Sequence, residues 1–201
     1  MEKLIAQGAE AKIIKRGNKI VKDRIKKSYR IEKLDTKIRI SRTKTETKLL
    51  LKASKIINCP KPLEQAKQGR MINMPFIDGK KLSEHLNKFS VEQQKTICKQ
   101  IGKDIAKLHN ANIIHGDLTT SNMILKDSKI FLVDFGLGFV SHKFEDKAVD
   151  LHLLKQALEA KHFQNHKNLW KSIGQGYKNK DSKKVLERLK AVEKRGRYKK
   201  H

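Results

Sequence analysis

The feature of this sequence that most restricts its fold is a pair of polar segments separated by a predicted β-hairpin. The first segment runs from His115 to Asn122, and the second is Asp134-Phe135-Gly136. Between them lie two apolar runs, 123–125 and 130–133, on either side of Asp127-Ser128. Asp and Ser are typical turn residues, so the two runs are expected to form short strands. Such a hairpin lets both polar segments reach one cleft.

Three side chains in these segments are suited to phosphoryl transfer. That reaction needs a carboxylate beside the acceptor oxygen and metal ions that bridge the phosphates. Asp117 can supply the carboxylate, whereas Asn122, five positions later, and Asp134 can bind Mg²⁺, which prefers hard oxygen ligands. Their order and separation resemble the catalytic loop and the D-F-G metal motif of protein kinases. The alternative, that Asp117 and Asn122 only stabilise a turn, leaves the ordered set unexplained.

The N-terminal quarter is predicted to add a lysine and a glutamate to the same site. Segments 11–15 and 19–22 alternate like two strands, and Lys22 ends the second of them. Its position resembles that of the kinase lysine that holds the α- and β-phosphates. A helix is predicted over 41–57, with Glu46 on its apolar face, where a carboxylate needs a cationic partner. Lys22 is the expected partner; the alternative is that Lys22 is one of many solvated lysines.

Two weaker segments are predicted to contact the nucleotide. One is a short loop with a single glycine where a kinase phosphate loop has three. In the other, a predicted strand over 71–74 leads into a hinge, where Pro75 offers a carbonyl to adenine and Ile77 an N–H. The alternative for Pro75 is a proline that simply opens a loop. The predicted contacts are Ile5, Ala6, Gln7, Gly8, Ala9, Glu10, Ala11 and Ile13 in the first segment, and Met74, Pro75 and Ile77 in the second.

Strands dominate the first part of the chain and helices the remainder. Ser90 and Gln93 form a capping-box pattern ahead of an apolar stripe at helical spacing. Two further helices are predicted around Leu151 and Leu189. The fold class is therefore α+β, in the form of a minimal bilobal protein-kinase-like fold. The expected parts are a strand-rich N-lobe over 1–74, a helical C-lobe over 75–193 and a mobile basic tail over 194–201.

The charge of the chain favours a polyanionic partner. Its 201 residues include 47 Lys and Arg against 21 Asp and Glu, a formal net charge of +26. RNA is the first candidate, and the alternative is that the charge only aids solubility. The sharpest local candidate is the tail, with Lys194, Arg195, Arg197, Lys199 and Lys200. With two cysteines and no apolar run long enough for a signal peptide or a membrane span, we expect a cytoplasmic protein without a membrane.

Stretches along nearly the whole sequence resemble one family, the small kinase-like subunit of the KEOPS complex, which acts in threonylcarbamoyl modification of adenosine in tRNA. The most specific are Lys27-Ser28-Tyr29-Arg30 and the loop Asp117 to Asn122. The other matching stretches are 8–11, 21–22, 24–26, 34–35, 42–43 with Glu46, 115–116, 134–138, 145–151 and 192–200. The resemblance implies ATP and Mg²⁺ as cofactors, ATPase activity and autophosphorylation. As partners it implies the large tRNA-modifying subunit, a small regulatory subunit and tRNA.

Several departures from ordinary protein kinases agree with this resemblance. Little room is left for an activation loop after Gly136, and no Ala-Pro-Glu segment is present. Thr119 replaces the lysine that follows the catalytic Asp by two positions, so a cation that would steady the transferring phosphate is missing. Slow turnover or ATP hydrolysis is therefore expected. Asp150 is predicted to hold the catalytic loop from behind by accepting its backbone N–H groups.

Two other readings remain open at this point. One is another small atypical kinase, such as a RIO-type ribosome-assembly ATPase, although the metal motif of that group usually lacks the Phe135-Gly136 pair. The other is a pseudokinase that acts as a basic RNA-binding scaffold. The presence of Lys22, Asp117 and Asp134 argues against the scaffold.

Overall fold

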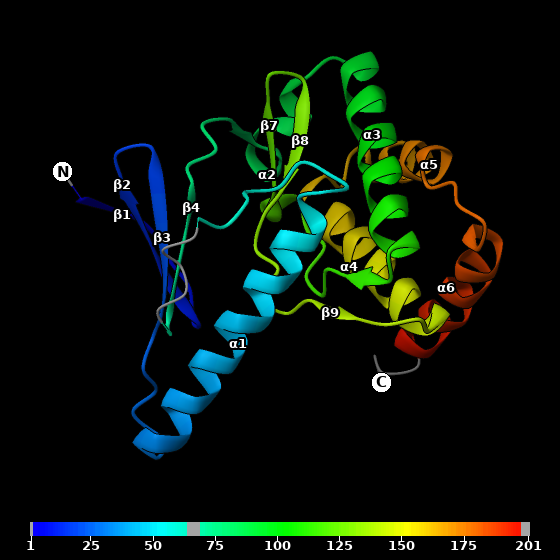
Figure 1. Ribbon diagram of the computed structural model, residues 1–201. Coiled ribbons are helices and arrows are strands. Elements are labelled where there is room, and N and C mark those ends of the chain that lie inside the picture. Colours follow the sequence, from blue (N-terminus) through cyan, green and yellow to red (C-terminus); the bar gives the residue numbers. More distant parts are fainter. Residues whose placement is uncertain (1, 64–68, 198–201) are drawn as a thin grey trace.

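The N-terminal part of the chain is an antiparallel sheet that faces one long helix. The computed structural model describes residues 2–63 and 69–197, without the side chains of the last two. The sheet has the order β1-β2-β3-β4, formed by Glu2–Gln7, Ala11–Arg16, Lys19–Arg24 and Met71–Pro75. Helix α1, Glu32–Ala53, runs beside the sheet and reaches into the helical part of the molecule (Figure 1).

Helices form most of the remaining chain. They are α2 (Leu82–His85), a 3₁₀ turn (Leu86–Lys88), α3 (Val91–Asn110), a second 3₁₀ turn (Thr120–Asn122), α4 (Phe144–Lys161), α5 (His166–Gly176) and α6 (Ser182–Arg197). The strands in this part are short: β5 (Lys80–Lys81), β6 (Ile113–Ile114), β7 (Met123–Lys126), β8 (Lys129–Leu132) and β9 (Phe139–Val140). The β7–β8 hairpin is the one predicted around Asp127. A strand-rich N-lobe and a helical C-lobe confirm the α+β, kinase-like fold.

The core of the C-lobe is continuous with the end of α1. Leu49, Leu50 and Ala53 of α1 pack in the same buried cluster as Leu132 and Phe135. This packing links α1 directly to the strand that leads into Asp134-Phe135-Gly136. A smaller cluster in the N-lobe joins Ile72 and Met74 of β4 to Ile20.

Helix α1 begins nine residues before the position predicted from the sequence. The expected start was Ser41, whereas the helix begins at Glu32. Its first turns bury charged rather than apolar residues: Arg39 Nε lies 2.6 Å from Asp35 Oδ2, and both side chains are almost fully buried. An ion pair at i and i+4 occupies the inward face there, so the apolar periodicity that marks a helix is missing.

Helix α3 begins at the predicted capping box and packs closely on α5. Ser90 Oγ accepts a hydrogen bond from Gln93 N, and Ser90 N donates to Gln93 Oε1. A Cβ on Gly102 would lie 2.1 Å from the carbonyl oxygen of Ile173, so only glycine permits this approach of α3 and α5. Helix α5 was not predicted from the sequence.

The last helix extends into the segment predicted as a tail. A mobile tail was expected from Lys194 onward, but helix α6 continues to Arg197. Glu145 of α4 explains part of this, because Arg188 and Arg195 both form ion pairs with it. Within the described residues, no helix has the length and apolarity needed to cross a lipid bilayer.

Candidate active site

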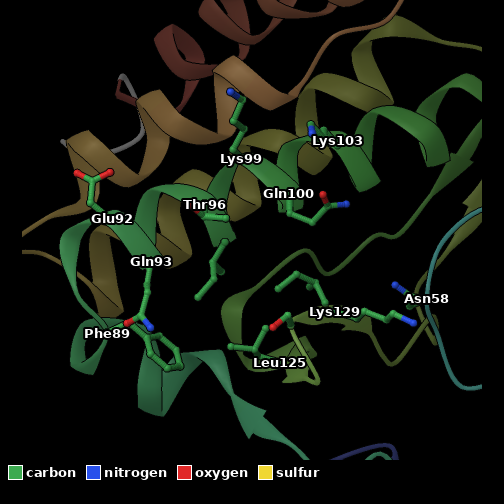
Figure 2. A pocket seen from close by; sticks show the side chains of 13 residues that line it. Asn58, Phe89, Glu92, Gln93, Thr96, Lys99, Gln100, Lys103, Leu125 and Lys129 are labelled. Carbon is green, nitrogen blue, oxygen red and sulfur yellow. The ribbon is translucent and has the colours of Figure 1, made fainter.

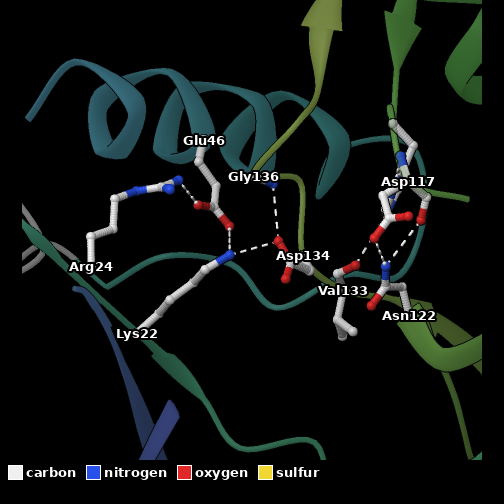
Figure 3. A network of polar contacts seen from close by, with 9 residues as sticks. Lys22, Arg24, Glu46, Asp117, Asn122, Val133, Asp134 and Gly136 are labelled. Atoms are coloured by element: carbon white, nitrogen blue, oxygen red, sulfur yellow. Dashed lines mark hydrogen bonds and ion pairs between the residues drawn. The ribbon is translucent and has the colours of Figure 1, made fainter. Parts of the chain in front are cut away.

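A buried glutamate of α1 lies against two cations of strand β3. Side chains alternate along a strand, so Lys22 and Arg24 point to the same side of β3. Lys22 Nζ lies 2.6 Å from Glu46 Oε1, and Arg24 Nη2 lies 2.6 Å from Glu46 Oε2. The Glu46 side chain is only 1% exposed (Figure 3). The ion pair expected between Lys22 and Glu46 is present, and Arg24 is an additional partner that was not predicted.

Lys22 also joins the N-lobe to the predicted metal motif. Its Nζ lies 2.6 Å from Asp134 Oδ1, and the same oxygen accepts a hydrogen bond from Gly136 N at 3.1 Å. Burial acts to raise the pKa of Asp134, but the Lys22 ammonium and these hydrogen bonds outweigh it and hold the pKa below its usual range. Asp134 therefore remains a carboxylate at neutral pH.

The backbone at Asp134 and Gly136 is adapted to this close approach. Asp134 has φ of 65°, a left-handed conformation that is uncommon for residues other than glycine, although Asn, Asp and His adopt it more often than the rest. A Cβ at Gly136 would lie 2.9 Å from Asp134 Oδ1 and 3.3 Å from Lys22 Nζ. A side chain at position 136 would thus compress the ion pair. Left-handed residues of this kind are often found at functional sites.

The predicted catalytic loop, residues 115–122, brings Asp117 and Asn122 together. Asn122 Nδ2 donates hydrogen bonds to Asp117 Oδ2 at 2.8 Å and to the Asp117 carbonyl oxygen at 3.0 Å. The backbone of Val133 donates to the carbonyl oxygen of Asn122 at 3.0 Å, which ties the loop to the strand before Asp134. The predicted trio of Asp117, Asn122 and Asp134 therefore comes from two chain segments joined at this point (Figure 3).

A buried carboxylate supports the catalytic loop from behind. Asp150 of α4 accepts hydrogen bonds from the backbone N–H groups of His115 at 2.8 Å and Gly116 at 2.9 Å, as the sequence predicted. His109 contacts the same carboxylate at 3.3 Å and Tyr177 at 2.8 Å, two supports that sequence reasoning missed. Neither His109 nor Tyr177 belongs to a recognisable sequence motif, so their role as supports is seen only in the three-dimensional structure.

His115 closes the loop against the metal motif. Its ring lies 4.5 Å from the ring of Phe135, measured between centroids, and its Nε2 is 3.1 Å from the carbonyl oxygen of Val133. Burial lowers the pKa of His115, although Asp150 and the Val133 carbonyl act in the opposite direction. The imidazole is therefore neutral at neutral pH, and its part in the site is packing and hydrogen bonding.

The residues of this site fit a Mg²⁺ ion. Mg²⁺ is usually held by one or two protein oxygens together with phosphate oxygens and water. Asp134 has a second carboxylate oxygen beyond the one that Lys22 contacts, and its side chain is 49% exposed. Asn122 uses its amide nitrogen for Asp117, which leaves its amide oxygen for a metal. Among the described residues, no cluster of three or more His, Cys, Asp or Glu side chains offers a different metal site.

The segments predicted to contact the nucleotide lie at the edge and end of the N-lobe sheet. Ile5, Ala6 and Gln7 are exposed on β1, whereas Ala11 and Ile13 lie on β2. The loop between these strands is closed by a hydrogen bond from Gly8 N to the Ala11 carbonyl at 3.0 Å. Ala9 and Glu10 lie in this loop, and Glu10 forms an ion pair of 2.6 Å with Arg42 of α1.

The predicted hinge follows β4. Met74 is buried in this strand and Pro75 is its last residue. The next residue, Phe76, donates its N–H to the carbonyl oxygen of Asn18 at 2.9 Å and contacts Lys15 through its ring at 3.7 Å. Ile77 follows in the connection between β4 and β5. The hinge role of Met74, Pro75 and Ile77 stays a prediction.

The structure describes only some residues of the predicted RNA-binding tail. Lys194 and Arg195 lie on α6, where Arg195 Nη1 is 2.7 Å from Glu145 Oε1. The side chain of Arg197, and Lys199 and Lys200 as a whole, lie outside the described residues. Arg195 is thus held by a carboxylate in this structure, so it does not extend freely from the last helix.

A cavity of about 790 Å³ lies apart from these residues, between α3 and the β7–β8 hairpin. Figure 2 shows its lining, which includes Phe89, Thr96, Lys99, Gln100, Lys103 and Lys129. No side chain predicted to be catalytic or to bind the nucleotide is part of this lining. The candidate active site is therefore defined by the charged network and the catalytic loop, and the cavity has no part in it.

Comparison with known proteins identifies the family. The RIO domain family matches residues 9–148 of this chain. The KEOPS complex subunit Bud32 of Pyrococcus abyssi is 40% identical over 98% of this chain and 96% of its own length. The chain belongs to the Bud32 family of RIO-domain proteins. This is a family of atypical serine/threonine kinases, as the sequence predicted.

Other Bud32 relatives differ in length. The probable serine/threonine-protein kinase BUD32 homolog of Archaeoglobus fulgidus is 39% identical over 94% of this chain and 92% of its own length. A probable bifunctional tRNA threonylcarbamoyladenosine biosynthesis protein of Methanobrevibacter smithii is 43% identical over 98% of this chain. In that protein the match covers 37% of the length. The match thus covers more than nine-tenths of the two Bud32 relatives but little over a third of the bifunctional one.

Proposed function

We propose that this chain binds ATP with Mg²⁺ and transfers or hydrolyses the terminal phosphoryl group, as the kinase/ATPase subunit of a KEOPS complex that supports threonylcarbamoyladenosine modification of tRNA. The observation that carries the proposal is the Lys22 ammonium, placed 2.6 Å from both Glu46 and Asp134. Phosphoryl transfer needs a held lysine and a metal-binding carboxylate at the same place. The second feature is Asp117, fixed by Asn122 beside them.

Each residue has a defined part in the reaction. Lys22 would exchange part of its contact with Asp134 for the α- and β-phosphates of ATP, while Glu46 keeps the ammonium in place. Asp117 would accept the hydrogen bond of the attacking hydroxyl or water and so orient its oxygen toward the terminal phosphorus. When bound by Asp134 and Asn122, Mg²⁺ would neutralise charge on the phosphate oxygens.

The shape of the site favours a small acceptor or water over a substrate peptide. Only seven residues separate Gly136 from Phe144, the first residue of α4. A segment of that length has no room for the activation loop that supports a peptide in ordinary protein kinases. Thr119 stands where those kinases place a lysine that steadies the transferred phosphate. Both features agree with slow ATP hydrolysis as the basal activity.

The partners that we propose for this chain are based on its family and on its net positive charge. The bifunctional relative carries a Bud32 segment within a longer protein named for threonylcarbamoyladenosine biosynthesis, which supports a large tRNA-modifying subunit as the main partner. A small regulatory KEOPS subunit is the second. The net charge of +26 supports tRNA as a ligand of the assembly. The proposed location is the cytoplasm.

Replacing Lys22 tests the proposed function. Lys22→Met removes the ammonium but keeps a buried apolar stem, so it should lower kcat/KM for Mg·ATP hydrolysis by roughly two to three orders of magnitude. Arg24 would still pair with Glu46, and the protein should remain folded. The measurement is steady-state phosphate release, with circular dichroism for the fold. Lys19→Met, on the same strand but exposed, is the matched control.

Wild-type rates for folded Lys22→Met would show that Lys22 is only a structural lysine. A scaffold without catalysis is separated by a second measurement. Mg·ATP should raise the melting temperature of the wild-type protein, because a ligand that binds only the folded state stabilises it. A scaffold shows no such shift.

The tail prediction concerns tRNA affinity. Neutralising Lys194, Arg197, Lys199 and Lys200 to Gln leaves the Arg195–Glu145 pair in place. Each lost phosphate contact should flatten the plot of log binding constant against log salt by about 0.7 to 0.9. Affinity should fall while basal ATP hydrolysis is unchanged. The measurement is tRNA binding at several salt concentrations, alone and with the partner subunits.

A control with the same change of charge decides whether position matters. Lys95, Lys99, Lys103 and Lys107 of α3 replaced by Gln also remove four positive charges. If tRNA affinity depends on net charge alone, the two variants will weaken binding equally, and the tail has no special role. Lys26, Lys27 and Arg30 would then be the next residues to replace.

A further inference from the structure

The two oxygens of Glu46 are each held by a different cation. Lys22 Nζ binds Oε1 and Arg24 Nη2 binds Oε2, both at 2.6 Å, and the three side chains are at most 6% exposed. The Nε of Arg24 is also buried and has no hydrogen-bond partner among the described residues. Burying a guanidinium in this way is costly, and buried ion pairs add little net stability. The buried position of Arg24 is therefore better explained by a role in positioning its neighbours than by a contribution to stability.

Charge balance shows what Arg24 does for its neighbours. The network contains two cations, Lys22 and Arg24, and two carboxylates, Glu46 and Asp134. Without Arg24, a single ammonium would face both carboxylates, and the surplus negative charge would be buried. Glu46 and Asp134 would then compete with ATP for Lys22, and the surplus charge would repel the phosphates.

Helix α1 is held in place without an activation loop. In ordinary protein kinases, activation-loop phosphorylation controls whether the glutamate of this helix meets the lysine. Here only seven residues link Gly136 to α4. A second buried network fixes the other end of α1, where Asp35 pairs with Arg39 and accepts the N–H of Lys27. A further ion pair of 2.6 Å joins Arg42 of α1 to Glu10 in the loop between β1 and β2.

From this arrangement we infer that Arg24 is a positioning residue of the ATP site: it neutralises and orients Glu46, so that α1 stays in its active position and the Lys22 ammonium is free to bind phosphate. The inference rests on the proposed ATP-dependent function. It assigns to one arginine of β3 the task that a regulated activation loop performs in other kinases. Arg24 acts through Glu46 and Lys22 and makes no contact with the reacting atoms.

The test compares two buried arginines that pair with carboxylates of α1 at the same distance. Arg24→Gln should raise the Kd for Mg·ATP about tenfold, a coupling of the size seen within one ion-pair network. Arg39→Gln, the matched control, removes the pairing of Asp35 far along α1 and should lower stability while leaving the Kd within about twofold, as expected of a separate network. Calorimetric titration of the full chain with Mg·ATP and urea unfolding are the measurements.

A conservative variant and a double variant exclude a merely structural role. Arg24→Lys keeps the charge balance, so this variant should fold. Lysine lacks the planar guanidinium group that fixes the orientation of Glu46, so the Kd for Mg·ATP should rise about threefold. In a Lys22→Met background, Arg24→Gln should cause no further loss of Mg·ATP affinity, because Arg24 acts through Lys22. If Arg24→Gln does not fold, Arg24→Lys decides the matter, and a wild-type Kd for it overturns the inference.

The remaining outcomes separate this inference from the proposed function. Equal effects of Arg24→Gln and Arg39→Gln on stability, with unchanged Kd for both, overturn the inference alone. Additive losses in the double variant with Lys22→Met also overturn it. Failure of the wild-type chain to bind Mg·ATP would overturn the proposed function, and the inference with it.

Discussion

Asp134→Asn should reduce Mg·ATP hydrolysis by roughly three orders of magnitude while leaving the protein folded. The Asp134 carboxylate is the charged ligand proposed for Mg²⁺, and a neutral amide replaces it poorly. Asparagine has nearly the same size and tolerates the left-handed backbone at φ of 65°. It can also still accept the hydrogen bond from Gly136 N. The loss of activity would therefore report the missing charge and not a distorted loop.

The change in stability should be small. The Asp134 side chain is 49% exposed, and an asparagine oxygen can still accept hydrogen bonds from Lys22 Nζ and Gly136 N, so the expected loss is about 1 kcal/mol. Phosphate release at saturating Mg·ATP measures activity, and urea unfolding measures stability. Asp127→Asn is the matched control, because Asp127 also has a positive φ but is exposed in the β7–β8 turn. Near-normal hydrolysis by folded Asp134→Asn would contradict the metal assignment.

Asp117→Ala should reduce Mg·ATP hydrolysis as much as Asp134→Asn does, but for a different reason. It removes the carboxylate that orients the acceptor, and it leaves the metal-binding oxygens of Asp134 in place. Binding of Mg·ATP should then persist while turnover is lost, whereas Asp134→Asn should weaken both. The two variants separate acceptor orientation from metal binding.

The arrangement of the predicted catalytic residues could be read from the sequence because their spacing along the chain reflects their geometry. Asp117 and Asn122 belong to one short loop, and Asp134 follows the hairpin that starts from it, so three-dimensional proximity is encoded locally. Glu46 was also predictable, because a carboxylate on an apolar helix face must meet a cation. Lys22 was the nearest candidate at the end of a strand. The structure joins Lys22, Glu46 and Asp134 by ion pairs. Asn122 holds Asp117, and the Val133 backbone ties their loop to the strand before Asp134.

Arg24 was not predictable as a partner of Glu46. The chain has 47 lysines and arginines, and nothing in a periodic pattern separates a buried arginine from a solvated one. The available signal was alternation along β3, which puts positions 22 and 24 on one face. The start of α1 was hidden for a related reason, since the pair of Asp35 and Arg39 occupies a face where apolar residues were expected. In a sequence, a helix face that buries paired charges has the same pattern as a helix face that is exposed to solvent.

Asp150→Ala should lower the free energy of unfolding by about 3 to 5 kcal/mol, because it removes the acceptor of two buried backbone N–H groups. Those groups belong to His115 and Gly116 and lie 2.8 and 2.9 Å from the carboxylate, which is 1% exposed. His109 would lose a partner as well. The loop that carries Asp117 would then keep its contact with the Val133 backbone and the packing of His115 on Phe135, but would lose its support from α4.

Activity should therefore fall together with stability, in contrast to Asp134→Asn. At temperatures where Asp150→Ala is still folded, the orientation of Asp117 is relaxed and kcat should decrease, while Mg·ATP affinity changes less because Lys22 and Asp134 belong to another segment. Urea unfolding and hydrolysis at low temperature provide both measurements. Asp146→Ala, one turn earlier on α4, removes only a hydrogen bond from Ser141 and should cost about 1 kcal/mol. If Asp150→Ala is no more destabilised than Asp146→Ala, the catalytic loop does not depend on Asp150 for its position.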